Sequence, residues 1–124
     1  ITNEEFVNYL FVGVDGYSHF GGYTGNGSAD GPYVWCGFSP AWVLIKNTAA
    51  EQWILHDSAR STYNPAAARI EPSVSDDEAT NINGLNFLST GFKVKTTDTG
   101  WNGDGTAYVY MAFAKLPFKY SNAR

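Results

Sequence analysis

Turn-forming residues interrupt this chain at short intervals, and they leave little room for long helices. The densest stretch, residues 21–38 (GGYTGNGSADGPYVWCGF), contains an Asn-Gly pair and an Asp-Gly-Pro sequence before it ends in aromatic residues. Asn-Gly favours a two-residue turn with positive φ, and Asp-Gly-Pro favours a second turn directly after it. We therefore expect two successive corners that carry the chain between sheets and deliver Tyr33, Trp35 and Phe38 to the core.

The short apolar runs between the turns have the composition of β-strands. Aromatic residues make up 16% of the 124 residues, and thirteen glycines provide tight turns. The best helical candidate, NPAAARI from Asn64, spans a turn or two. The sequence predicts an all-β fold, an antiparallel β-sandwich or jelly-roll-like single domain over residues 1–124, in which residues 1–15 also fit a strand shared with, or following, a preceding domain. The expected strands are Phe6–Val12, Phe20–Thr24, Tyr33–Gly37, Trp42–Asn47, Trp53–Asp57, Ala68–Glu71, Asn86–Leu88, Phe92–Thr96 and Ala107–Ala114.

Two of these strands differ in the faces they are expected to bury. In AWVLIKN, residues 41–47, the apolar run is continuous, which indicates a central strand covered on both faces. In GFKVKTT, residues 91–97, apolar residues alternate with Lys93 and Lys95, which indicates an outer sheet or a position near an edge. Residues 6–11 (FVNYLF) also resemble residues 108–113 (YVYMAF), as expected if the unit follows another of its kind or if both ends pair in one sheet.

Charge and composition limit the partners. The formal net charge is −4, and the eight Lys and Arg are scattered along the chain, which argues against nucleic acid or an anionic membrane surface. No apolar run approaches the roughly 18 residues of a membrane span, and the first residues lack the basic start of a signal peptide. Because there is a single cysteine, the chain cannot form an internal disulfide or a thiolate metal cluster.

Residues of catalytic type are present, but their spacing does not favour catalysis. Cys36, His56 and Asp57 are the types of a thiol nucleophile and its partners, but neighbouring strand residues such as His56 and Asp57 point to opposite faces. We expect Cys36 to be a small buried hydrophobe. Asp57 and Arg60 fit a turn-stabilising ion pair or Asx-turn, with a ligand contact as the alternative. We predict no enzyme activity, no cofactor and no metal.

The loop DTGWNGDG, residues 98–105, is the best candidate binding site in the sequence. No strand periodicity requires Trp101 there, and an exposed Trp beside Asp98, Asn102 and Asp104 has the chemistry of sugar recognition. The alternative is that Trp101 folds back over one end of the sandwich or packs against a neighbouring subunit. The same oxygens make Ca²⁺ conceivable, although Asx-Gly turns use them without an ion. Tyr17 is a further candidate ligand contact.

The order of five sequence blocks carries a family resemblance over about residues 16–124. The blocks are YTGNGSADGPYVWCGFSPAWVLIKNT, WILHDSAR, YNP, GLNFLSTGFKV and WNGDGTAYVYMAFAKLPFKYSNAR. In this order they resemble the C-terminal domains of tail-fibre and tail proteins of tailed bacteriophages. No single tripeptide is specific, whereas the succession of blocks is. The resemblance supplies no catalytic site and no receptor-contacting residue by position.

The resemblance implies a virion structural protein, located in a tail fibre or another exposed appendage, and a homotrimer. The expected function is attachment to host cell-surface structures, a glycan or a protein receptor, by multivalent non-covalent binding. One alternative is a purely structural virion protein that contacts other virion proteins. The second is a polysaccharide-degrading tail enzyme, which requires two facing carboxyl groups. The acidic run at residues 76–78 favours a solvated loop or helix start over such a pair.

Overall fold

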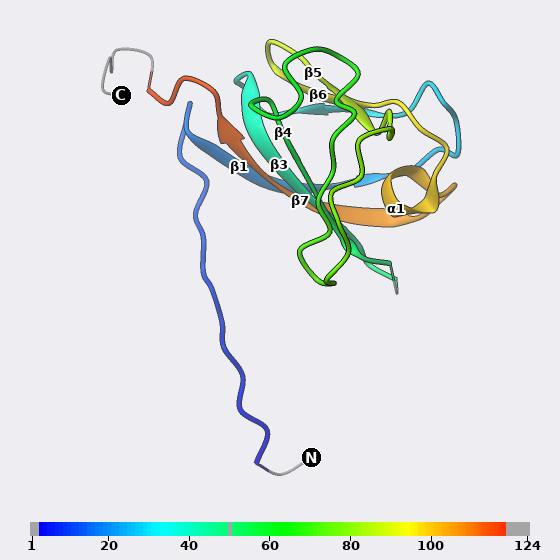
Figure 1. Ribbon diagram of the computed structural model, residues 1–124. Helices are drawn as coiled ribbons and strands as arrows, with labels where there is room; N and C mark the ends of the chain where they lie inside the picture. The colour runs from blue at the N-terminus through cyan, green and yellow to red at the C-terminus, as the bar shows by residue number, and fades with distance from the viewer. Residues whose placement is uncertain (1–2, 50, 119–124) are drawn as a thin grey trace.

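The chain folds into two antiparallel β-sheets that share one core (Figure 1). The computed structural model describes residues 3–49 and 51–118. The larger sheet has the order β1 (Ser18–Thr24), β7 (Ala107–Ala114), β3 (Pro40–Asn47) and β4 (Trp53–Asp57), and the smaller has the order β2 (Tyr33–Trp35), β6 (Gly91–Val94) and β5 (Leu85–Phe87). One short helix, α1 (Thr99–Asn102), precedes β7. The predicted all-β sandwich is confirmed.

Alternation along the strands explains the core. On β7, Tyr108, Tyr110 and Ala112 are buried, and the residues between them face outward. Both sheets contribute to a single apolar cluster. Its buried members are Val34, Cys36, Val43, Ile45, Ile54, Ala66, Leu85, Phe92, Val94, Trp101, Tyr108, Tyr110 and Ala112.

The strand β3 is central, as predicted, because it lies between β7 and β4. Val43 and Ile45 are fully buried, whereas Trp42 and Leu44 on the opposite face are only half-buried. The expectation that both faces are covered is therefore only partly correct. The outer face of the larger sheet keeps a shallow apolar hollow of about 140 Å³, lined by Phe20, Leu44, Trp53, Val109, Tyr110 and Met111.

The two predicted corners carry the chain from β1 in the larger sheet to β2 in the smaller one. Gly27 of the first corner has φ +63°, the conformation for which Asn-Gly is suited. The prediction that Tyr33 and Trp35 enter the core is wrong. Val34 and the following Cys36 are buried instead, since Val34 pairs with Phe92 and strand alternation turns its neighbours outward.

Two other predicted strands differ from the structure. Residues 6–12 pair with no strand among the described residues and extend away from the sandwich (Figure 1). Residues 68–71 make only single bridges, Leu55 to Ile70 and Arg69 to Ala79. Continuous pairing is lacking in both segments, so their apolar composition alone does not make strands of them.

The strand β6 is central in its sheet and not near an edge, although one of its faces is wet as predicted. Lys93 on that face forms an ion pair with Asp30 at 2.9 Å, and Lys95 lies 3.7 Å from the same carboxylate. The hydrogen bond from Lys93 and its charge lower the pKa of Asp30. No helix in the described part of the chain is long and apolar enough to cross a bilayer.

Candidate functional site

The structure encloses the predicted binding residue Trp101. Its side chain has no exposed surface and joins the core cluster. The indole Nε1 donates to Nε2 of His56 at 3.0 Å, and the Arg69 guanidinium lies 5.1 Å from the ring centroid. The expectation of an exposed Trp101 is therefore wrong, and its position fits the alternative in which it folds back onto the sandwich.

The Trp101 and His56 side chains can contact each other because Gly84, packed against both, has no side chain. A Cβ at Gly84 would lie 2.8 Å from Nε2 of His56 and 2.9 Å from Nε1 of Trp101. Burial lowers the pKa of His56 to about 4, because a charged imidazole would lose its hydration there, and the Ala68 backbone offsets this only in part. His56 is thus held neutral as a hydrogen-bond acceptor for the indole.

Asn102, also predicted as a ligand contact, fastens three loops together. Its Nδ2 donates to the carbonyl oxygens of Ser28 at 2.7 Å and Thr96 at 2.9 Å. Its Oδ1 accepts from the backbone N–H of Asn26 at 2.8 Å. Asn102 is fully buried, and these bonds satisfy the hydrogen-bonding groups of its side-chain amide within the protein. A role for Asn102 as a direct surface contact is incorrect for this structure.

The two acidic residues of the same loop remain at the surface. Asp98 is the N-cap of α1, and its Oδ1 accepts from the Gly100 N–H at 2.8 Å. Asp104 follows the helix and lies against Gly27 of the first corner. Among residues 3–49 and 51–118, no three His, Cys, Asp or Glu side chains gather closely enough to hold a metal ion.

The structure does not bring Cys36, His56 and Asp57 together as a reactive group. Burial raises the pKa of the Cys36 thiol to about 11. His56 bonds Trp101, and Asp57 forms an ion pair with Arg60. The Asp57 carboxylate also accepts the backbone N–H of Arg60 at 2.8 Å. The predicted turn-stabilising pair of Asp57 and Arg60 is therefore confirmed.

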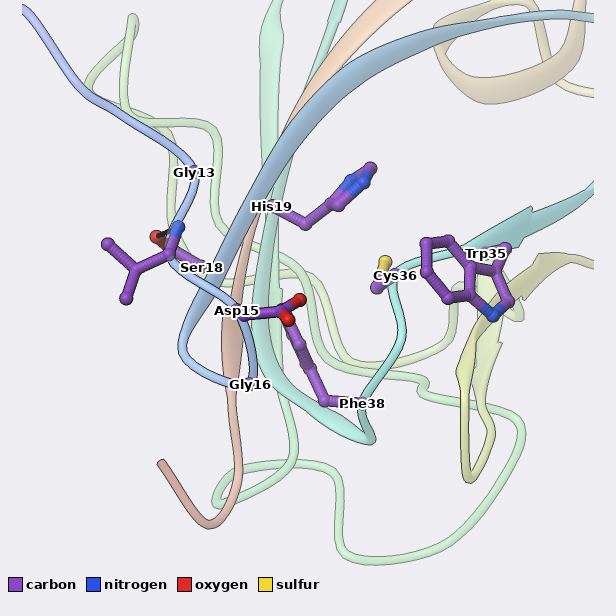
Figure 2. A pocket seen from close by; sticks show the side chains of 9 residues that line it. Gly13, Asp15, Gly16, Ser18, His19, Trp35, Cys36 and Phe38 are labelled. Atoms are coloured by element: carbon purple, nitrogen blue, oxygen red, sulfur yellow. Dashed lines mark hydrogen bonds between the residues drawn. The ribbon is translucent and has the colours of Figure 1, made fainter. Parts of the chain in front are cut away.

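An open pocket of about 340 Å³ lies between the turn before β1 and the segment after β2 (Figure 2). Tyr17, the last predicted ligand contact, belongs to this turn. It is 38% exposed and stacks on Phe118 with ring centroids 5.3 Å apart, so it borders the pocket without lining it. The lining residues are Gly13, Val14, Asp15, Gly16, Ser18, His19, Trp35, Cys36 and Phe38.

The aromatic wall of this pocket is formed by Trp35 and His19. Trp35 is 59% exposed, and its ring lies against Gly37, whose φ of +79° suits glycine. The His19 ring stands edge-on to Trp35, with centroids 5.8 Å apart and planes at 86°. Nδ1 of His19 lies 2.8 Å from the Tyr110 hydroxyl, which fixes the imidazole. The core residue Tyr110 thus fixes the position of His19 in the aromatic wall.

A carboxylate completes the pocket. Figure 2 shows the Asp15 side chain reaching from the turn toward Phe38, while His19 extends from β1 toward Trp35 and Cys36. Asp15 is exposed, and Gly16 beside it has φ +70°. The pocket therefore combines a large apolar ring with an imidazole and a carboxylate, which can bind a polar ligand that also has an apolar face.

Sequence reasoning missed this pocket because it assigned Trp35 to the core. The available signal was the alternation in YVWC, since Val34 and Cys36 form an equally apolar inward pair. Asp15 and His19 gave no signal by spacing. They line one pocket with Trp35 because β1, with the turn before it, and β2 belong to different sheets that face each other.

Comparison with known proteins gives a family without an assigned activity. Residues 1–117 match DUF7483, which is described as a domain of unknown function. Neither a curated protein nor a solved structure matches the chain. Since the match spans nearly the whole sequence, the chain belongs to the DUF7483 family.

Proposed function

We propose that this chain is a virion protein of the tail-fibre type that attaches to a glycan on the host cell surface through the Trp35 pocket. The resemblance of its five sequence blocks to phage tail proteins supports the virion location, in a fibre or another exposed appendage. The observation that carries the binding role is the Trp35 ring, more than half exposed in an open pocket that also holds Asp15 and His19.

The chemistry of the pocket suits a sugar. The apolar face of a pyranose stacks on an indole ring, and its hydroxyl groups bond to carboxylate and imidazole groups at the rim. Asp15 supplies the carboxylate, and His19 supplies a ring whose Nδ1 is already occupied by Tyr110. A ligand would therefore stack on the Trp35 ring and be oriented by Asp15 and by Nε2 of His19.

Binding without covalent chemistry agrees with the groups present. Glycoside hydrolysis commonly needs two carboxyl groups about 5–10 Å apart across the scissile bond, and Asp15 is the one carboxylate among the residues that line the pocket. The raised pKa of Cys36 keeps its thiol protonated at neutral pH. These features favour an adhesin over the polysaccharide-degrading alternative.

Weak individual sites are sufficient for such a protein. If three copies form a homotrimer, and several fibres act on one particle, avidity exceeds the single-site affinity by about 10²–10⁴. The alternative of a purely structural virion protein gives a different expectation for Trp35, which would then be covered by another virion protein instead of a glycan.

Adsorption to cells tests the proposal. Purified labelled protein is incubated with a panel of candidate host bacteria, together with Trp35→Ala and the control Trp53→Ala, which removes an exposed Trp from the outer face of the larger sheet. We expect selective adsorption that free surface polysaccharide competes away, that is lost in Trp35→Ala and that is kept in Trp53→Ala. Absence of adsorption to every host, or equal adsorption of all three proteins, would overturn the proposal.

A further inference from the structure

The N-terminal segment exposes an apolar surface that a monomer leaves uncovered. We call residues 3–13 the arm; Figure 1 shows it extending away from both sheets. Its six large apolar side chains are between 57% and 94% exposed: Phe6, Val7, Tyr9, Leu10, Phe11 and Val12. A run of this kind has the pattern of a strand covered on both faces. Within the part of the chain that the structure describes, one aromatic ring of the arm packs against another: Phe11 lies beside Phe20 of β1, with centroids 5.6 Å apart.

The strand β1 offers a free edge. It lies at the end of the larger sheet, and among the described residues its backbone pairs with β7 and, at Ser18 alone, with Val14. Tyr17 and Gly25, just outside the strand, bond to the β7 side, with N–H···O distances of 2.9 and 2.8 Å. Since bonding alternates along an antiparallel strand, Phe20, Gly22 and Thr24 direct their backbone groups away from β7. The opposite edge of this sheet is partly covered, because Leu55 of β4 exchanges two bonds with Ile70.

A tight turn already sets a register between the arm and β1. Val14 and Ser18 form an antiparallel bridge with two backbone bonds of 3.1 and 2.9 Å. Continuing this register places Val12 opposite Phe20, Leu10 opposite Gly22 and Asn8 opposite Thr24. The arm thus matches the β1 edge in length as well as in apolar character.

The Ser18 hydroxyl bonds the arm where it leaves the sheet. It accepts from the Val14 N–H at 3.1 Å and donates to the Val12 carbonyl oxygen at 3.2 Å. In a continued hairpin that carbonyl would instead accept from the Phe20 N–H. The Val12 carbonyl oxygen thus bonds the Ser18 side chain at the point where the chain leaves the sheet.

We propose that the arm pairs with the β1 edge of a second copy of this chain, as an exchanged fifth strand of the larger sheet. Exchange of an identical element is a low-cost route to an oligomer, because the same contacts serve every copy. It covers the apolar side chains of the arm and pairs the free backbone groups of β1 in one step.

The two adjacent glycines of β1 fit this arrangement. In the same register Gly21 and Gly22 lie opposite Phe11 and Leu10, so two small positions face two large ones. A Cβ at Gly22 would lie 2.9 Å from the Tyr108 carbonyl oxygen, and one at Gly21 would lie 3.1 Å from the Tyr110 hydroxyl. Packing against β7 therefore keeps these positions small and leaves room for the side chains of an incoming strand.

Cross-linking between two single-cysteine variants tests the exchange directly. Chains with Asn8→Cys are mixed with chains carrying Thr24→Cys under a mild oxidant; both positions are exposed, and the native Cys36 is buried. We expect a disulfide-linked heterodimer to form at least tenfold faster than in the control mixture, where Tyr63→Cys replaces Thr24→Cys. Tyr63 is an exposed position outside the arm and the β1 edge. Directly opposed strand positions come within the Cα separation of about 4.4–6.8 Å that a disulfide requires.

Mass measurement by sedimentation provides a second readout on the same chain. We expect an oligomer that becomes a monomer in Leu10→Asp/Phe11→Asp, while Tyr63→Asp remains an oligomer. A monomeric parent chain at all concentrations would overturn the proposal. So would cross-linking within one chain of the double variant Asn8→Cys/Thr24→Cys, without linkage between chains, because the arm would then be a strand of its own sheet.

Discussion

Trp35 and Trp101 each lie beside a glycine-containing turn, but one is 59% exposed and the other is fully buried. The two tryptophans differ in the groups that contact the indole N–H and the ring. Trp101 bonds His56 and lies under Arg69, so its polar atom is satisfied inside the protein. Trp35 has Gly37 against its ring and the edge of His19 beside it, on the outward face of β2.

The comparison shows that a tryptophan in a turn-rich loop is not by itself a sign of an exposed binding site. The loop around Trp101 contains a polar side chain, Asn102, whose bonds to Ser28 and Thr96 draw the whole segment inward. The segment around Trp35 is a strand, and alternation alone decides which side chain is exposed. A stable enclosed site and an open one are therefore distinguished by partners far away in the sequence.

The largest effect should come from removing the enclosed ring. Trp101→Ala empties the space beside His56 and Gly84, and we expect the free energy of unfolding to fall by about 3–5 kcal/mol. Urea denaturation followed by far-UV circular dichroism measures the change. A loss below about 1 kcal/mol would contradict the enclosed position of this ring.

Acid should weaken the same enclosed pair. The folded pKa of His56 is about 4 and the ordinary value is 6.5, so between these values the unfolded chain binds more protons. The contribution of His56 to stability is complete above pH 6.5 and decreases as the pH falls toward 4, by about 3 kcal/mol in total. Denaturation at several pH values, compared with His56→Gln, isolates this contribution, because the carboxylates titrate in both proteins. Parallel pH curves for the two would refute it.

A smaller loss is expected where a polar group holds the Trp101 loop. Asn102→Ala removes the bonds to Ser28 and Thr96, and it leaves the Asn26 N–H without its acceptor. We expect the free energy of unfolding to fall by about 2 kcal/mol, since water can reach part of the freed groups. The matched control is Asn86→Ala, in the short strand β5. Equal small losses in both variants would show that the buried amide does not hold the loop.

The fold was predictable because its main signals are local. Turn residues and strand alternation located the seven strands of the described residues closely enough to give the sandwich, and the order of the two corners gave the change of sheet. The candidate site was not predictable, because Asp15, His19 and Trp35 come together only where the two sheets face each other. Residues 6–12 were wrongly predicted to be a strand because their apolar pattern is that of a strand, whereas they pair with no strand among the described residues.

The smallest effect on stability is expected for the open ring. Trp35→Ala removes a side chain that is mostly in water, so the free energy of unfolding should change by less than about 1 kcal/mol. Thermal denaturation of Trp35→Ala and Trp101→Ala under the same conditions measures the difference between them. If Trp35→Ala were nearly as costly as Trp101→Ala, the His19 and Tyr110 contacts would depend on the ring, and lost adsorption would then report unfolding. A stable Trp35→Ala chain that no longer adsorbs would instead assign the exposed indole to recognition, because nothing else in the protein needs it.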